Sequence, residues 1–173
     1  MKKKNIVYVG LSADILHEGH INILKVANKL GEVIVGLLTD QAIASYKKIP
    51  HLTYKQREVV LKNIKFVNKV IPQKTLDYSD NLNLIKPNYV VHGNDWKSGI
   101  QKETRAKVIK EIKKWGGKLI EPTYTKNISS TLIKKKISEI VSTENRVSRL
   151  KRLMYSKNIV RILESHNSLT GLI

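Results

Sequence analysis

The segment Ile6–Leu30, IVYVGLSADILHEGHINILKVANKL, contains a strand pattern, a turn and a helix pattern in direct succession. Its apolar run, Ile6–Gly10, is typical of a buried strand, whereas apolar residues between Gly19 and Leu30 recur at helical spacing. A strand that feeds a helix through a short polar turn presents the helix N-terminus at the edge of a sheet. The unpaired backbone N–H groups and the positive dipole end of that terminus suit a phosphate group.

Two histidines, His17 and His20, stand three residues apart where the helix pattern begins. Residues at this spacing share one face of a helix, so both imidazoles are placed to donate to the same anion. A histidine pair at a helix start also serves in capping, in core packing or in metal binding. The pair alone leaves these alternatives open.

Apolar runs alternate with helical patterns along most of the chain. Continuous apolar runs indicate strands that are covered on both faces, and a regular strand–helix succession indicates a parallel sheet. We therefore predict an α/β fold, a Rossmann-like doubly wound parallel sheet of about five strands. The predicted strands are Ile6–Gly10, Val33–Leu38, Val67–Ile71, Tyr89–His92 and Lys118–Glu121, and the predicted helices are Gly19–Leu30, Tyr54–Ile64, Asn81–Ile85 and Lys102–Trp115.

The composition narrows the class of protein. The chain has 173 residues, of which 41% are hydrophobic, so it can form one domain with a substantial core. No apolar run approaches the roughly 20 residues of a membrane span, and the start of the chain lacks a signal-peptide core. Cysteine is absent, which excludes disulfides, thiolate metal sites and cysteine nucleophiles. We expect a cytoplasmic protein without membrane insertion.

The formal net charge of +18 admits four interpretations: a solvated surface, an anionic membrane surface, nucleic acid as partner or anionic small substrates. The lysines are spread along the chain, which favours a solvated surface. One aromatic-rich patch, Tyr89–Trp96, is suited to stacking on bases, but no basic stripe accompanies it. We therefore expect no nucleic-acid partner. A nucleic-acid or membrane-surface binding module remains the alternative from a different class, and it predicts strong, salt-sensitive binding.

The C-terminal part differs from the rest. Residues 129–140 have a helix pattern, and Val141–Val147 is polar with weak periodicity, like a linker. The final stretch is either a terminal helix that packs back on the domain or the opening of a second domain. Its last residues, Val160–Ile173, resemble the start of phosphoenolpyruvate mutase domains. We expect one domain over residues 1–141, and a linker with the start of a truncated mutase domain over 142–173, with the fused domain continuing beyond Ile173.

Three motifs resemble the nucleotidyltransferase superfamily. The first is His17-Glu18-Gly19-His20, which resembles its HxGH signature, and the likeness is strongest to cytidylyltransferases that use CTP and a small phosphate-bearing alcohol. The second, Gly93–Trp96, resembles the Gly-Asp-Asp-Trp loop of that family. The third, Ile128–Thr131, resembles its Ile-Ser-[Ser/Thr]-Thr signature, whose hydroxyl groups at a helix start form another phosphate cradle.

The resemblance implies cytidylyl transfer: an acceptor oxygen attacks the α-phosphate of CTP and pyrophosphate leaves, while the protein aligns the two and neutralises charge. It implies catalytic roles for His17, His20 and Lys48. It also implies nucleotide contacts for a larger set: Ser12, Ala13, Asp14, Gly19, Arg57, Gly93, Asn94, Asp95, Trp96, Ile128, Ser129, Ser130 and Thr131. Gly19 is expected to be small because a side chain there would push the nucleotide away from the backbone.

The chain departs from the family pattern at several positions. Leu11–Asp14 reads Leu-Ser-Ala-Asp where the family usually has Gly-Thr-Phe-Asp, and Asn94 replaces an acidic residue. Tyr46 stands where enzymes acting on glycerol phosphate carry a lysine for the substrate, which argues against that acceptor. Lys126 is placed to replace an arginine that often precedes the third motif.

The longer segment Tyr89–Arg105 resembles cytidylyltransferase domains fused to phosphoenolpyruvate mutase. It therefore favours a phosphonate acceptor, such as 2-aminoethylphosphonate or hydroxyethylphosphonate, with Tyr46, Lys97 and Arg105 as substrate contacts. The alternative acceptor is glycerol 3-phosphate or phosphocholine. Mg²⁺ as cofactor and a homodimer are implied by the family alone, and the sequence does not identify the metal ligands.

Overall fold

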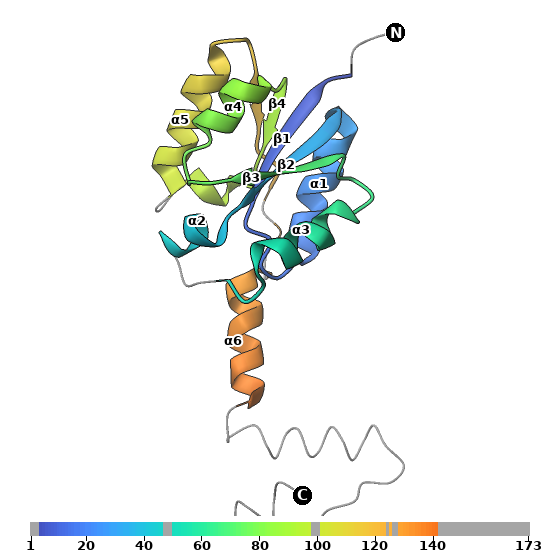
Figure 1. Ribbon diagram of the computed structural model, residues 1–173, viewed down its shortest axis with the longest axis vertical. Coiled ribbons are helices and arrows are strands. Elements are labelled where there is room, and N and C mark those ends of the chain that lie inside the picture. Colours follow the sequence, from blue (N-terminus) through green and yellow to red (C-terminus); the bar gives the residue numbers. More distant parts are fainter. Residues whose placement is uncertain (1–3, 47–49, 98–100, 124, 126–127, 142–173) are drawn as a thin grey trace, which may run out of the picture. The chain divides into compact units, whose positions relative to one another are not determined.

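A computed structural model describes residues 4–46, 50–97, 101–123, 125 and 128–141, and its centre is a five-stranded sheet (Figure 1). All four pairs of neighbouring strands are parallel. The prediction of a Rossmann-like doubly wound α/β fold is confirmed. The strands follow the order β3-β2-β1-β4-β5, with the bounds β1 (Ile6–Leu11), β2 (Glu32–Leu38), β3 (Lys69–Gln73), β4 (Tyr89–Val91) and β5 (Lys118–Ile120).

Helices cover both faces of the sheet. On one face, α1 (Glu18–Leu30) and α3 (Tyr54–Lys62) pack through Leu24, Ala27 and Leu61 into a cluster that includes Val7 and Val9. On the other face, α4 (Ser79–Ile85) and α5 (Lys102–Lys113) pack through Leu82, Val108 and Ile112 against Tyr8 and Val90. Successive residues of β1 therefore point to opposite faces, and both faces are apolar, as a buried parallel strand requires.

The sheet reverses its direction of growth between β1 and β4. The chain runs from β1 to β2 and β3 on one side, and it then crosses to β4, which pairs with β1 at Val7–Tyr89 and Tyr8–Val90. The loops after β1 and β4 thus leave the same edge of the sheet at neighbouring positions. In open α/β sheets, ligands bind outside the carboxyl ends of the strands at such a switch point.

The strand β3 begins two residues later than predicted, and its turn explains the shift. The backbone N–H of Val67 donates to Ile64, which closes the turn that follows α3. The backbone N–H of Asn68 then donates to Val33, and its side-chain oxygen accepts from the Val33 N–H at 2.8 Å. Ladder pairing with β2 therefore starts at Lys69.

The helix α2 (Asp40–Ala44) was not predicted because it has only five residues and no apolar period. Its start is nevertheless encoded locally, since the Thr39 side chain accepts from the Ala42 N–H at 3.2 Å. The helix α5 ends at Lys113, two residues before its predicted end at Trp115, and two glycines follow it. Gly116 has φ 79°, and the Gly117 N–H donates to Ile112 at 2.9 Å.

The chain divides into two compact units, Met1–Ser130 and Thr131–Ile173. The helix α6 (Ser130–Val141) begins at the last residue of the first unit and supplies the described part of the second. The predicted linker and mutase-like segment, 142–173, lie outside the described residues. No helix in the described part of the chain has the length and apolarity to cross a membrane.

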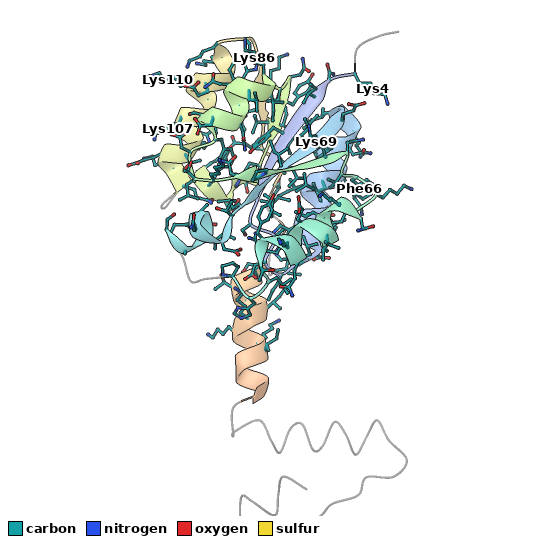
Figure 2. All side chains as sticks on the ribbon, in the orientation of Figure 1. Lys4, Phe66, Lys69, Lys86, Lys107 and Lys110 are labelled. Atoms are coloured by element: carbon teal, nitrogen blue, oxygen red, sulfur yellow. The ribbon has the colours of Figure 1, made fainter. Side chains whose placement is uncertain are left out.

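The lysines labelled in Figure 2 come from several parts of the chain. Lys69 opens β3, Lys86 follows α4, and Lys107 and Lys110 lie on α5. This distribution is the one expected of a solvated basic surface.

Candidate active site

The turn after β1 is fixed by a buried carboxylate. Asp14 is 2% exposed, and its Oδ1 accepts from the backbone N–H groups of His51 (2.7 Å) and Leu52 (3.1 Å). These amides belong to the segment that leads into α3, so Asp14 ties the two loops together. The neighbouring Ala13 is buried with φ 49°, a left-handed conformation that costs a non-glycine residue about 1–2 kcal/mol. The turn therefore has one specified conformation.

The two histidines lie against each other at the start of α1. His17 is the N-cap residue, and its backbone N–H donates to Nδ1 of His20 at 3.4 Å. The ring centroids are 4.0 Å apart. Because Nδ1 of His20 accepts a hydrogen bond, the neutral ring carries its proton on Nε2. His20 is thus arranged as an Nε2–H donor.

The His17 ring has an unused polar atom. Its Nδ1 is buried and has no hydrogen-bond partner among the described residues. Burial lowers the pKa of His17, against a smaller opposing effect of Glu18, so the neutral imidazole is favoured. A buried polar atom without a hydrogen-bond partner is uncommon in a folded protein. Together with the positive dipole end of α1, it marks this turn as a candidate place where a ligand completes the hydrogen bonding.

Gly19 has a different neighbour from the one expected. A Cβ atom at this position would lie 3.0 Å from both Cε1 and Nδ1 of His17, and 3.7 Å from Cβ of Thr125. The small residue therefore makes room for the His17 ring. That a side chain here would also push a nucleotide away from the backbone stays a prediction.

Gly19→Ala is expected to lower kcat without lowering the free energy of unfolding. The added methyl group pushes the His17 ring by a few tenths of an ångström, and we expect kcat to fall about tenfold because reacting groups tolerate little misplacement. The free energy of unfolding should not fall, since alanine is favoured over glycine in a helix by about 1 kcal/mol. Steady-state kinetics and urea unfolding measure the two quantities, with the exposed Lys25→Ala in α1 as control. Unchanged kcat would show that the ring position does not matter.

The third sequence motif lies beside the first. The Ser130 hydroxyl donates to the carbonyl oxygen of Ile15 at 3.1 Å, although 115 residues separate the two. Nearby, the Asn22 side chain donates to Oγ1 of Thr125 at 3.2 Å. The half-buried Ile128 and Ser129 precede Ser130. Thus the segment before α6 packs on the β1 turn and on α1.

Two predicted members of this motif region contribute less to the described site. Thr131 is exposed and belongs to the second compact unit. Lys126 lies outside the described residues, and so does the predicted catalytic residue Lys48.

Arg57 is buried and fully engaged. Its side chain is inaccessible to solvent, and it pairs with Asp40 at 2.6 Å. It also donates to the backbone carbonyls of Ser12 (2.5 Å) and Leu52 (3.1 Å). The guanidinium therefore joins the end of β1, the start of α2 and the segment before α3. Arg57 thus supports the site by holding these three segments together. Asp40 was not identified as its partner from the sequence.

Tyr46 also faces the β1 turn. Its hydroxyl group is hydrogen bonded to the side chain of Ser12, and its ring packs on Leu38, Ala42 and Ile43. Burial raises the pKa of the Tyr46 hydroxyl, so it stays protonated at neutral pH. The predicted acceptor-contacting residue is thus an uncharged hydroxyl beside Ser12.

The loop after β4 forms the other side of the switch point. Gly93 leads into a 3₁₀ turn over Asn94–Lys97, and Trp96 within it is 1% exposed. The Trp96 ring stacks on His92, with centroids 3.8 Å apart and planes 8° from parallel. A ring so buried anchors the loop and cannot offer a face to a base, which corrects the predicted role of Trp96 as a direct nucleotide contact. The half-buried Asn94 and the exposed Asp95 remain candidates for that contact.

The two cations predicted to bind the acceptor share a partner that the sequence analysis missed. Arg105 donates to both carboxylate oxygens of Glu121, at 2.8 and 2.9 Å, and Lys97 lies 3.6 Å from the same group. Glu121 directly follows β5 at the same sheet edge. A polar residue just after a buried strand is the signal that would have found it, and the same signal applies to Asp40 after β2.

The described residues contain no group of three or more His, Asp or Glu side chains that could hold a metal ion. A Mg²⁺ ion that travels with a triphosphate needs only one or two carboxylates from the protein. Asp14 uses Oδ1 for two amides, whereas the Asp95 carboxylate is 48% exposed, 3.8 Å from His92. The donor set therefore fits an ion held mainly by substrate phosphates, with Asp95 as the accessible carboxylate.

Comparison with known proteins agrees with this geometry. The cytidylyltransferase-like family model matches residues 8–136. Glycerol-3-phosphate cytidylyltransferase of Bacillus spizizenii is 35% identical over 98 residues, which cover 54% of this chain and 74% of the relative. Ethanolamine-phosphate cytidylyltransferase of Mus musculus is 38% identical over 87 residues, which cover 47% of this chain and 21% of the relative.

Among solved structures, the lipopolysaccharide core biosynthesis protein of Thermoplasma volcanium superposes with a TM-score of 0.60 and 27% identity, over 71% of this chain and 100% of that protein. The family model spans most of the described fold and all three motifs, from within β1 to within α6. The chain therefore belongs to the cytidylyltransferase-like family and is a nucleotidyltransferase.

Proposed function

We propose that this protein transfers a cytidylyl group from CTP to the phosphate monoester of a small alcohol or amino alcohol. The observation that carries the proposal is the meeting of two distant motifs at the switch point, through the 3.1 Å hydrogen bond between Ser130 and Ile15. The relatives named above act on glycerol 3-phosphate and on ethanolamine phosphate. These acceptors are phosphate monoesters, so they support that class over the phosphonates favoured by the sequence.

In the proposed reaction, a phosphate oxygen of the acceptor bonds to the α-phosphorus of CTP. The bond between that phosphorus and the oxygen bridging to the β-phosphate breaks, and pyrophosphate leaves with the electron pair. A phosphate monoester is largely dianionic at neutral pH, because its second pKa lies near 6, so no general base is needed. The protein must place the two anions together and stabilise the charge that moves onto the leaving group.

The described residues supply donors for this task. The backbone amides at the start of α1 and the Nε2–H of His20 are the groups we assign to the triphosphate. His17, neutral and adjacent, is assigned to the same anion. Mg²⁺ would supply additional positive charge to the phosphates when bound, with Asp95 as the protein ligand that we propose for it.

Tyr46 bears on the choice of acceptor. A neutral hydroxyl, rather than a lysine, lies beside Ser12. An acceptor that carries its own positive charge is not repelled by this neutral hydroxyl. An acceptor that needs a cation from the protein finds none at this position. We therefore expect ethanolamine phosphate or choline phosphate to be used more efficiently than glycerol 3-phosphate.

Pyrophosphate release from CTP tests the proposal with four acceptors: ethanolamine phosphate, choline phosphate, glycerol 3-phosphate and 2-aminoethylphosphonate. We expect the highest kcat/KM with an amino-alcohol phosphate and background release without acceptor. ATP and UTP replace CTP in parallel reactions. Release with phosphonates alone would overturn the acceptor class and keep cytidylyl transfer, while release only with ATP would overturn the nucleotide.

A further inference from the structure

The Glu121 carboxylate binds three polar side chains on one side of the candidate site. Its Oε1 accepts from the Trp96 indole N–H at 2.7 Å and from Arg105 Nε at 2.8 Å. Its Oε2 accepts from a second Arg105 nitrogen at 2.9 Å, with the Lys97 ammonium 3.6 Å away. One carboxylate thus links the end of β5, the first turn of α5 and the 3₁₀ turn after β4.

The charge of Glu121 is permanent under ordinary conditions. The Arg105 guanidinium, together with the Trp96 indole N–H and the Lys97 ammonium, lowers the pKa of the Glu121 carboxyl to about 2. The carboxylate side chain is only 14% exposed, so water competes little for its oxygens. A forked guanidinium–carboxylate pair is among the more directional interactions in proteins. Glu121 is therefore a fixed acceptor and not a titrating switch.

Through Trp96, the Glu121 carboxylate also fixes the position of the loop after β4. Its ring is held on the N–H edge by Glu121 and on one face by His92, whose Nδ1 lies 2.9 Å from the Gly93 carbonyl oxygen. Since a carbonyl oxygen only accepts, that nitrogen carries the proton. Moving the indole would therefore move His92 and with it the backbone at Gly93. The exposed neighbour Asp95 lies one residue before the anchored ring.

The anchored loop lies next to the β1 turn. Parallel pairing of β1 with β4 runs through Val7–Tyr89 and Tyr8–Val90, and the two strands end at Leu11 and Val91, so the loops that follow them leave the same edge of the sheet. A nucleotide at the switch point therefore has the His17–His20 turn on one side and the anchored loop on the other.

We propose that Glu121 is a positioning residue that holds the Gly93–Trp96 loop in place for nucleotide binding. This inference rests on the proposed function, because it takes the nucleotide to be the ligand of this crevice. Glu121 makes no contact with substrate in the proposal. Its loss should weaken nucleotide binding through the loop while the histidine turn, which it does not touch, keeps its catalytic arrangement.

Glu121→Gln tests this role, because glutamine has nearly the same shape but cannot hold the two cations. We expect the Kd of CTP, measured by isothermal titration calorimetry, to rise about tenfold, whereas kcat at saturating CTP stays within about threefold. Glu121→Asp keeps the charge and should recover part of the affinity. The control is Glu111→Gln on α5, which loses bonds to Lys114 (2.7 Å) and Asn83 (3.0 Å) away from the loop.

A second readout does not depend on catalysis. In a Trp115→Phe background, Trp96 is the remaining indole, and the Gln variant should show red-shifted emission and easier quenching by acrylamide. Unchanged CTP affinity with unchanged Trp96 emission would overturn the proposal, as would equal loss in Glu111→Gln. If the Gln variant fails to fold, Arg105→Lys breaks the same fork and is judged by the Kd of CTP and by Trp96 emission alone. A wild-type protein that binds no CTP overturns the proposed function, and Trp96 emission alone then decides whether Glu121 positions the loop.

Discussion

His17→Ala and His20→Ala are each expected to lower kcat by about two to three orders of magnitude, the effect of removing one preorganised donor from a developing anion. The structural reason is that these imidazoles lie together at the start of α1, with ring centroids 4.0 Å apart. Nδ1 of His17 has no hydrogen-bond partner among the described residues. Burst and steady-state measurements of pyrophosphate release from CTP measure the loss.

The same variants should fold nearly as well as the wild type. Each imidazole is only partly buried, and the His17 N–H to His20 contact is long, at 3.4 Å. We expect the thermal midpoint to move by no more than a few degrees. Asn28→Ala, an exposed position near the other end of α1, is the control for changes in the helix. A variant that loses stability yet retains turnover would mean that the histidines only cap the helix.

Local sequence patterns were sufficient for most of the fold. The run Val33–Leu38 is apolar at every position except Gly36, which marks a strand buried on both faces. Helix ends were encoded by Thr53, which caps α3, and by Gly116 after α5. Where the prediction was off, at β3, a hydrogen bond to another segment decided the boundary, whereas α2 is too short to show an apolar period. The Asn68–Val33 pair, for example, joins residues 35 apart.

The motifs of the candidate site could be predicted from the sequence, but the partners of their charged residues could not. The histidine turn and the serine segment were found because they resemble signatures of the nucleotidyltransferase superfamily and because their residue types suit phosphates. Partners such as Asp40 for Arg57 and Glu121 for Arg105 were missed because each pair is 16 or 17 residues apart, across a strand or helix boundary. A charged residue gives no local sign of whether it will meet a substrate or a buried counter-ion.

Trp96 shows the same limit for aromatic residues. A tryptophan in a loop after a strand is equally consistent with stacking on a base and with anchoring the loop. The Trp96 side chain is only 1% exposed, which shows that it anchors the loop. This burial comes from the packing of α5 and of Tyr78 against the ring. Packing of this kind depends on which elements become neighbours, so the fold had to be known first.

The second large effect is expected at Arg57, whose replacement should destabilise the fold. In Arg57→Ala the carbonyls of Ser12 and Leu52 lose their donor, and Asp40 loses its counter-ion. Each buried acceptor left unpaired costs about 1–3 kcal/mol, so we expect the free energy of unfolding to fall by about 3 kcal/mol. The Asp40 side chain is 42% exposed and can be hydrated again, which keeps the loss below that of a fully buried ion pair. Urea unfolding measures the change.

A comparison with two further variants tells which contact matters. Arg57→Lys keeps the positive charge but loses the fork, so it should fall between wild type and Arg57→Ala. Combining Arg57→Ala with Asp40→Asn in a double-mutant cycle isolates the ion pair, and a coupling of about 1 kcal/mol or more is expected for groups 2.6 Å apart. Lys55→Ala, exposed on the same helix, should have no effect. If Arg57→Ala changes the unfolding free energy no more than Lys55→Ala does, the buried guanidinium does not hold the β1 turn, and the site must be organised by Asp14 instead.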